Sequence, residues 1–253
     1  MRARRRAVVE HPSPNFGPRP TDAAIDLLIL HYTGMQSAEA AIARLCDRAA
    51  AVSAHYVIDE DGTVYRLVDE RERAWHAGVS AWQGRGDVNS FSVGIELVNP
   101  GHEWGYRAFP AAQLAACAQL SRAIVKRHAI PASRVLGHSD VAPARKQDPG
   151  ERFDWAHLAH HGVGLWPPDE PADGDDDETG VALLARGAGG PAVLALQTAL
   201  VRFGYSCPTT GMFDAATETV VLAFQRHFRP GRLDGRFDRE CRRRLAWLLA
   251  EMD

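Results

Sequence analysis

An acidic, proline-rich stretch divides this chain and limits where a folded core can form. Residues 167–180 read PPDEPADGDDDETG and show no apolar periodicity. Such a segment buries too little apolar surface to offset the entropy of ordering it, so we predict a solvated linker over 167–182. Two parts can then build cores, a large one at 21–166 and a small one at 183–253, with 1–20 as a Pro- and Arg-rich extended arm.

The larger part alternates between strand-like and helical patterns. The apolar run IDLLIL at 25–30 predicts a strand buried on both faces, and SVGIELV at 92–98 predicts another. An alanine-rich stretch at 37–50 and an amphipathic stretch at 111–128 predict helices. Asp61-Gly62 predicts a hairpin, and hence one antiparallel pair. The alternation indicates an α/β fold, with a mixed central sheet flanked by helices.

Composition excludes several classes of partner. The formal net charge is −3, so we expect no general attraction to nucleic acid. No apolar run approaches the roughly 18 residues of a membrane span. The basic start lacks the apolar region of a signal peptide, so we expect a cytoplasmic protein, with the periplasm or cell envelope as the alternative.

Three side chains form a candidate metal site. His31 ends the first buried strand, His138 follows a second strand-like run, and Asp148 lies ten residues beyond it on a loop rich in Pro and Gly. Two imidazoles and one carboxylate suit Zn²⁺ and leave its fourth position for water. Zinc lowers the pKa of that water to about 7, so the pattern predicts hydrolytic chemistry. A structural role for each histidine is the alternative.

Two further residues could complete a hydrolytic site. Glu96 interrupts an apolar strand, where a carboxylate is costly unless it is paired or functional. Lys146 stands two residues before Asp148, so an extended loop points both side chains the same way. Its ammonium could stabilise an oxyanion. An outward-facing glutamate and a surface lysine are the alternatives.

Five motifs in this order resemble the type 2 N-acetylmuramoyl-L-alanine amidase family, which is related to the peptidoglycan recognition proteins. The resemblance covers about residues 20–165. It implies one zinc ion per catalytic domain, bound by His31, His138 and Asp148, with Glu96 as the acid/base and Lys146 as the transition-state stabiliser. The motifs are LHYTG (30–34), SAHYVID (53–59), AWHAG (74–78), NSFSVGIELVN (89–99) and GHSDVAPARKQDPG (137–150).

The same motifs suggest residues beyond the metal. His76 is expected in the pocket wall and Asn89 in contact with substrate, whereas His55 alternates with apolar neighbours and is expected in the core or behind the ligands. Relatives without the strand glutamate carry a tyrosine where this chain has Ala54. That difference places more weight on Glu96.

The C-terminal part predicts a small three-helix domain. Pro191–Phe203 is the first expected helix, and Asp214 and Asp238 are expected N-caps of two more. With TGMFD at 210–214 and DGRFD at 234–238, the segment resembles the type 1 peptidoglycan-binding domain. The partners so implied are peptidoglycan or muropeptide fragments.

The resemblance implies hydrolysis of the amide between N-acetylmuramic acid, including its 1,6-anhydro form, and L-alanine of the stem peptide. A non-catalytic peptidoglycan receptor is the alternative in a different class. A zinc peptidase that cuts within the stem peptide would share the metal chemistry.

Overall fold

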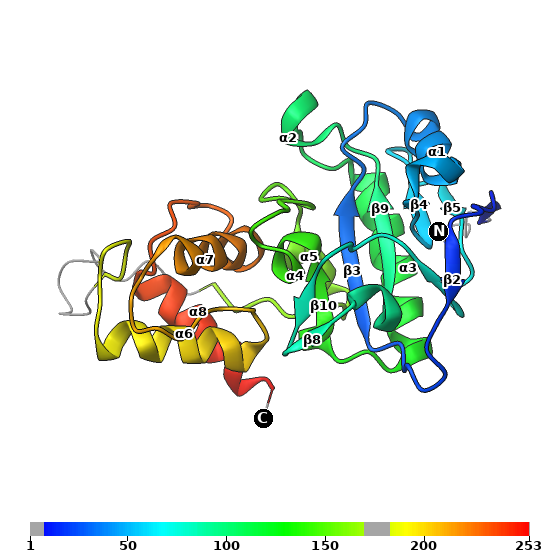
Figure 1. Cartoon of the computed structure of the whole chain (residues 1–253). Helices are drawn as coiled ribbons and strands as arrows, with labels where there is room; N and C mark the ends of the chain where they lie inside the picture. The colour runs from blue at the N-terminus through cyan, green and yellow to red at the C-terminus, as the bar shows by residue number, and fades with distance from the viewer. Residues whose placement is uncertain (1–7, 170–182, 253) are drawn as a thin grey trace.

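The computed structural model describes residues 8–169 and 183–252, and a six-stranded mixed sheet forms its centre (Figure 1). Strand order is β1-β5-β4-β9-β3-β10, in which β4 and β5 are antiparallel and every other neighbouring pair is parallel. The prediction of an α/β fold with a mixed sheet is confirmed. The strands are β1 (Val9–Glu10), β3 (Leu27–Tyr32), β4 (Tyr56–Ile58), β5 (Val64–Arg66), β9 (Ser92–Leu97) and β10 (Val135–Gly137).

Helices and two small two-stranded sheets surround this centre. The helices are α1 (Ala38–Cys46), α2 (Gly101–Trp104), α3 (Ala111–His128), α4 (His138–Val141) and α5 (Trp155–His160), with 3-10 turns at Arg48–Ala50, Val88–Phe91 and Ala132–Arg134. The small sheets pair β2 (Phe16–Pro18) with β6 (Glu72–Ala74), and β7 (Ala81–Trp82) with β8 (Arg85–Gly86).

The apolar strand β3 is buried on both faces, as its sequence predicts. Leu28 and Leu30 pack in one cluster with residues of α3 and α5, whereas Leu27 and Ile29 belong to a second cluster on the other face. His31 follows this alternation and shares the face of Leu27 and Ile29. The strand therefore delivers an imidazole to the end of a rigid, fully buried element.

The helix expected over 37–50 is shorter than its alanine content indicates. Ser37 caps the start by accepting a hydrogen bond from the Ala40 N–H, and α1 ends at Cys46. Asp47 takes an extended conformation, and its side chain accepts from Ala49 N–H at the start of the next turn. The aspartate is the physical reason for the break, because its carboxylate competes for backbone donors.

The N-terminal arm is extended, but its described part is built into the domain. β1 pairs with β5, and β2 pairs with β6. The Arg19 guanidinium donates to the carbonyl oxygens of Glu70, Asn89, Ser90 and Ser92. Residues 8–20 are thus part of the folded unit, and residues 1–7 lie outside the described chain.

The expected linker lies almost entirely outside the described residues, which exclude 170–182. The boundaries proposed at 20, 166 and 182 remain predictions. All four cysteines, at positions 46, 117, 207 and 241, are free. Within the described ranges, no helix is both long and apolar enough to cross a membrane.

The three helices expected in the C-terminal part are present. They are α6 (Pro191–Phe203), α7 (Ala215–Phe228) and α8 (Arg239–Ala250). Asp214 accepts from Thr217 N–H and Asp238 from Cys241 N–H, so both aspartates are the N-caps that the sequence predicts. Figure 1 places this bundle beside α4, α5 and β10, at one edge of the sheet.

The C-terminal bundle packs directly against the sheet domain. Trp82 is 1% exposed, and its ring lies edge-on to Phe203 and Tyr205, with centroid distances of 5.7 and 5.0 Å. Gln83 N–H donates to the Gly204 carbonyl at 2.8 Å. One apolar cluster therefore runs from β3 into α6 and α7, and the bundle is more than a module on a flexible tether.

Trp82→Ala should lower the free energy of unfolding by about 3–5 kcal/mol, because a buried ring is lost from the shared cluster. Urea unfolding followed by circular dichroism measures this change. Trp104→Ala is the matched control, since Trp104 is 60% exposed and should change stability little. Equal effects of the two substitutions would contradict the shared core.

Candidate active site

The register between β3 and β9 brings the first two site residues together. His31 is paired with Glu96 in these parallel strands, so both side chains leave the same face of the sheet. Ser92 and Gly94 precede Glu96 on that face. Strand pairing thus makes residues 31 and 96 neighbours in space although they are far apart in the sequence.

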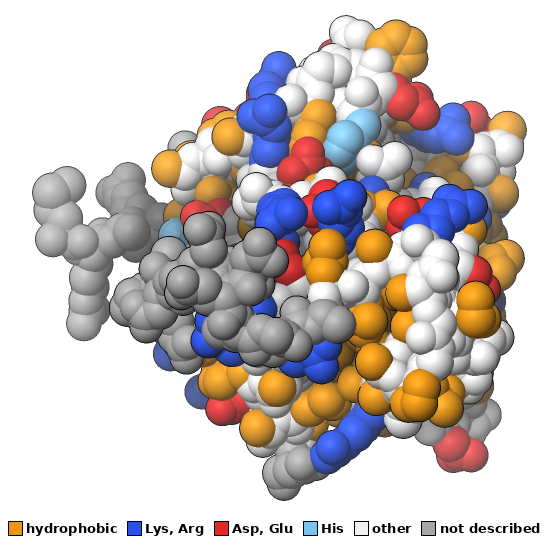
Figure 2. Space-filling view, turned by 90° about the vertical axis from the view of Figure 1, so that its left-hand side faces the viewer, with side chains coloured by type: hydrophobic (Ala, Val, Ile, Leu, Met, Phe, Trp, Pro, Cys, Tyr) orange, Lys and Arg blue, Asp and Glu red, His pale blue; other side chains and the backbone are white. Residues whose placement is uncertain are grey.

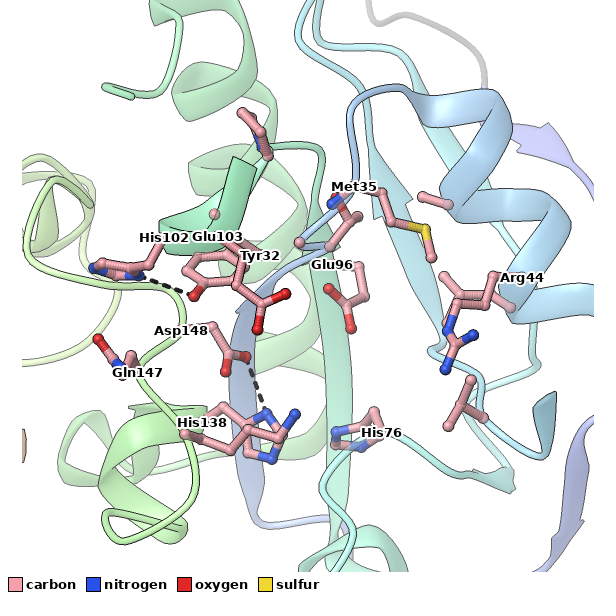
Figure 3. A pocket seen from close by; sticks show the side chains of 18 of the residues that line it. Tyr32, Met35, Arg44, His76, Glu96, His102, Glu103, His138, Gln147 and Asp148 are labelled. Carbon is pink, nitrogen blue, oxygen red and sulfur yellow. Dashed lines mark hydrogen bonds and ion pairs between the residues drawn. The ribbon is translucent and has the colours of Figure 1, made fainter. Parts of the chain in front are cut away.

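The other expected ligands arrive from the neighbouring strand and the loop beyond it. β10 pairs with β3 on its other side and leads directly into α4, whose first residue is His138. The loop after α4 folds back toward the start of that helix, where Ser139 N–H donates to the Asp148 carbonyl at 2.9 Å. This closed loop places the Asp148 carboxylate against both imidazoles, and Figure 3 shows it beside the ring of His138.

Three ligand atoms converge on one point. Nδ1 of His31 lies 3.0 Å from Nδ1 of His138 and 3.0 Å from Oδ2 of Asp148, and the last two atoms are 2.9 Å apart. All three residues are buried. The predicted residues therefore form a group that could hold a metal ion.

Hydrogen bonds decide which nitrogen of His138 faces that point. Nε2 of His138 lies 3.0 Å from the Ala77 carbonyl oxygen. A carbonyl only accepts, so Nε2 carries the hydrogen, and in the neutral ring Nδ1 then presents a lone pair. This arrangement, with the outer nitrogen bound to a backbone oxygen, is typical of a metal-ligating histidine.

A second chain of hydrogen bonds decides the tautomer of His31. Ser92 donates to the Val88 carbonyl at 2.7 Å, so its oxygen accepts from Nε2 of His76 at 3.1 Å. Nδ1 of neutral His76 is then an acceptor for Nε2–H of His31, 3.0 Å away. His31 is left with a lone pair on Nδ1, directed at the ligand group.

His76 therefore does more than line the pocket wall. It lies in the pocket lining, as expected, but its ring is buried and orients His31. Gly94 makes room for it, since a Cβ at that position would lie 2.5 Å from the His76 ring. His55 is buried beside it and accepts from Gly94 N–H at 2.9 Å, which agrees with the core role expected for it.

The donor set fits a small divalent cation. A tetrahedral zinc ion with bonds of about 2.0–2.1 Å holds its ligand atoms about 3.3 Å apart, close to the separations found here. With both rings neutral, two imidazole lone pairs and a carboxylate oxygen at this range repel one another, and a bound cation would relieve that repulsion. Burial, and then the neighbouring His138, lowers the pKa of His31 to about 4, so the ring is neutral at pH 7 and free to bind metal.

Glu96 stands beside this group on the paired strand β9. Its Oε2 is buried and has no hydrogen-bond partner in the described part of the chain. Burial, followed by the Asp148 carboxylate, raises the pKa of Glu96 well above its usual range, and the charge of Lys146 opposes the rise. An unpaired carboxyl group with a raised pKa in a cleft is typical of an acid/base catalyst.

The pocket in front of the ligands is a cavity of about 390 Å³ that mixes charge and aromatic surface. Lys146 lines it together with His76, Glu96, His138 and Asp148. Several lining residues were not predicted. They are Tyr32, Arg44, Trp75, His102, Glu103 and Arg145.

The contacts of two of these residues explain why the sequence did not predict them. Arg145 donates to the carbonyl oxygens of Ala77 at 2.9 Å and Val79 at 2.7 Å, so it holds the wall opposite its own loop. His102 pairs with the Tyr32 hydroxyl at 2.9 Å (Figure 3). The adjacency of Arg145 to Lys146 was a usable signal for the former; His102 offers none.

Asn89 is placed away from the pocket lining. It is buried, and its Oδ1 accepts the backbone N–H groups of His76 at 3.1 Å and Ala77 at 2.8 Å. The amide side chain thus holds the segment that carries His76 and the carbonyl partner of His138, and its expected contact with substrate stays a prediction. A short polar side chain does this well because two adjacent N–H groups can share one oxygen.

Comparison with known families agrees with this geometry. Residues 21–151 match the family described as N-acetylmuramoyl-L-alanine amidase, and residues 189–245 match a peptidoglycan binding domain. The chain is 35% identical over 229 residues to N-acetylmuramoyl-L-alanine amidase AmiD of Escherichia coli K12, covering 85% of this chain and 79% of AmiD.

Two solved structures are similar in fold to this chain over most of its length. The complex of E. coli AmiD with the substrate anhydro-N-acetylmuramic acid-L-Ala-D-gamma-Glu-L-Lys has a TM-score of 0.74 and 33% identity, covering 92% of each chain. AMPDH3 from Pseudomonas aeruginosa in complex with anhydromuramic pentapeptide has a TM-score of 0.74 and 31% identity, covering 93% of this chain and 96% of that one. With its ligand group, strand glutamate and both matched domains, the chain belongs to the N-acetylmuramoyl-L-alanine amidase family.

Proposed function

We propose that this chain is a zinc-dependent amidase that hydrolyses the amide between the lactyl group of N-acetylmuramic acid and L-alanine of the stem peptide. Membership of the amidase family supports the reaction class. The observation that carries the proposal is the meeting of His31, His138 and Asp148 within 3.0 Å, with Glu96 on the adjoining strand.

His31, His138 and Asp148 would hold the ion, and their outer hydrogen bonds prepare them for it. Zn²⁺, when bound, supplies Lewis acidity that polarises the scissile carbonyl and lowers the pKa of water to about 7. His76 and the Ala77 carbonyl keep both imidazoles in the tautomer that leaves Nδ1 unprotonated. The protein thus avoids reorganising its ligands when metal arrives.

Glu96 is the proposed acid/base. It takes a proton from the attacking water and delivers it to the leaving nitrogen of L-alanine. Its Oε2 has no hydrogen-bond partner among the described residues, so this oxygen is available for the transfer. Burial and the Asp148 carboxylate raise the pKa of Glu96 well above its usual range, which favours its uptake of a proton from the attacking water.

Lys146 is the proposed stabiliser of charge on the carbonyl oxygen. Its ammonium faces the same cavity as Glu96 and Asp148, and no step requires it to lose a proton. Arg44 and Arg145 in the cavity lining are suited to the carboxylates of a stem peptide. Trp75 offers an apolar surface for a sugar ring.

Muropeptide fragments, including anhydro forms, are the proposed substrates, because the solved relatives hold anhydromuramic ligands. The C-terminal domain is proposed to bind peptidoglycan and so to raise the local substrate concentration. On the face shown in Figure 2, basic, acidic and hydrophobic side chains are intermixed. Cytoplasmic location remains a prediction, which cell fractionation tests.

The proposal is tested by metal analysis together with an assay for free L-alanyl amino termini on a defined anhydro-muropeptide. We expect one zinc per chain, loss of cleavage with a chelator and recovery with Zn²⁺. Binding without new amino termini would favour the receptor alternative. Mass spectra that show cleavage within the stem peptide would favour the peptidase alternative.

Glu96→Gln should keep zinc and lose turnover by about 10²–10⁴-fold, because the amide cannot transfer the proton. The kcat for muropeptide cleavage measures the loss, and zinc content verifies the site. Glu72→Gln, a strand glutamate outside the pocket lining, is the control and should leave kcat near that of the wild type. A fully active Glu96→Gln enzyme would refute the assignment.

Lys146→Gln should move the acidic limb of the pH profile of kcat/KM to higher pH. The base works only when deprotonated, so activity falls as the pH drops through the pKa of Glu96. Lys146 opposes the rise of that pKa, and its removal lets the pKa climb further. Lys126→Gln, on the exposed end of α3, should leave the limb in place. An unmoved limb in Lys146→Gln would exclude this coupling.

A further inference from the structure

A completely buried carboxylate lies on the same short helix as a proposed metal ligand. Asp140 is 0% exposed and stands two residues after His138 in α4. Its Oδ2 accepts from Gly137 N–H and from Nδ1 of His227, each at 2.7 Å, and its Oδ1 accepts from the Tyr205 hydroxyl at 2.7 Å. A carboxylate this deep is stable only with such donors.

Two of those three donors come from the C-terminal bundle. Tyr205 follows α6, and His227 lies on α7. Burial, and then the Asp140 carboxylate, raises the pKa of Tyr205 well above its usual range, so the hydroxyl keeps its hydrogen and donates. The bundle therefore supplies most of the compensation for burying this charge.

Asp140 in turn holds the backbone that presents His138. By accepting from Gly137 N–H, its carboxylate closes the turn on which the imidazole stands. On the other side of the turn, Ser139 N–H is bound to the Asp148 carbonyl at 2.9 Å. The turn is thus fixed between the C-terminal bundle and the loop that carries the third ligand.

The environment of His227 indicates that its hydrogen bond to Asp140 is the reason for a histidine there. The ring is stacked between Trp155 and Phe228, with centroid distances of 3.6 and 3.8 Å. Its Nε2 is buried and has no partner among the described residues. A phenylalanine would fill this stack without burying an unsatisfied nitrogen, so packing alone does not explain the histidine.

We propose that Tyr205 and His227 are positioning residues for the metal site, so that the C-terminal bundle completes the site through Asp140. This inference rests on the proposed binding of metal by His31, His138 and Asp148. It gives the bundle a second role beside attachment to peptidoglycan, because the ligand turn is held from outside the sheet domain. The Tyr205 hydroxyl and Nδ1–H of His227 are the two hydrogen-bond donors, and neither residue lines the substrate cavity.

The test uses the full chain and measures the dissociation constant for Zn²⁺ by competition with a chromophoric chelator, with the visible spectrum of bound Co²⁺ as a second readout. Tyr205→Phe and His227→Phe each remove one donor and keep a ring. Each should weaken Zn²⁺ binding by about tenfold, the lower end for residues that support metal ligands, and should alter the Co²⁺ spectrum.

Tyr56→Phe is the matched control. Tyr56 is also buried, and its hydroxyl also donates to a buried carboxylate, that of Glu70, at 2.6 Å. Neither residue lines the substrate cavity. It should lower the melting temperature about as much as Tyr205→Phe while leaving Zn²⁺ affinity and the Co²⁺ spectrum as in the wild type. His227→Asn retains a donor near the position of Nδ1 and should recover most of the affinity lost in His227→Phe.

The outcomes separate this inference from the proposed function. Wild type that binds no metal would overturn both. Wild type that binds zinc, with Tyr205→Phe and His227→Phe equally tight, would overturn the positioning role alone. Equal losses of Zn²⁺ affinity in Tyr56→Phe and Tyr205→Phe would also overturn it, since the affinity would then follow overall stability. Equal losses of Zn²⁺ affinity in His227→Asn and His227→Phe would do the same, since the affinity would then depend on the imidazole ring and not on the hydrogen-bond donor.

Discussion

The parallel pairing of β3 with β9 is the constraint on which the site depends. In this register His31 and Glu96 are neighbours, and the small residues before Glu96 leave space for the His76 ring. A shift by one residue would turn either side chain to the opposite face, where the apolar cluster with α3 lies. The buried alternation of β3 therefore specifies the register that brings metal ligand and acid/base together.

Around that pairing, buried hydrogen bonds decide the chemistry of the ligands. The Ala77 carbonyl sets the tautomer of His138, and the path through His76 and Ser92 sets that of His31. Asn89 then holds the segment containing residues 76 and 77. One short segment thus orients both imidazoles, which explains why so many polar groups are buried behind the wall of the cavity.

The C-terminal bundle belongs to the same physical system. Trp82 joins the apolar core of the two parts, and Asp140 joins their polar groups. Neighbouring domains joined only by a linker would be expected to move independently. Here a buried interface next to the ligand turn connects the fold of one part to the geometry of the other.

The sequence alone determined the main elements and pointed to the residues proposed for the chemistry. The apolar run before His31, the hairpin at Asp61-Gly62, the helix over 111–128 and the capping aspartates 214 and 238 all act through local backbone preferences. The five ordered motifs identified the family, and their order in the chain pointed to His31, His138 and Asp148. Such features can be read because their physical causes lie within a few residues.

Only the tertiary structure decided what the supporting residues do. Asn89 holds backbone where a substrate contact was expected, residues 8–20 are built into the domain, and Asp140 is satisfied by donors 65 and 87 residues away. No local pattern marks such partners, because the cost of burying a polar group depends on which distant donors the fold brings to it.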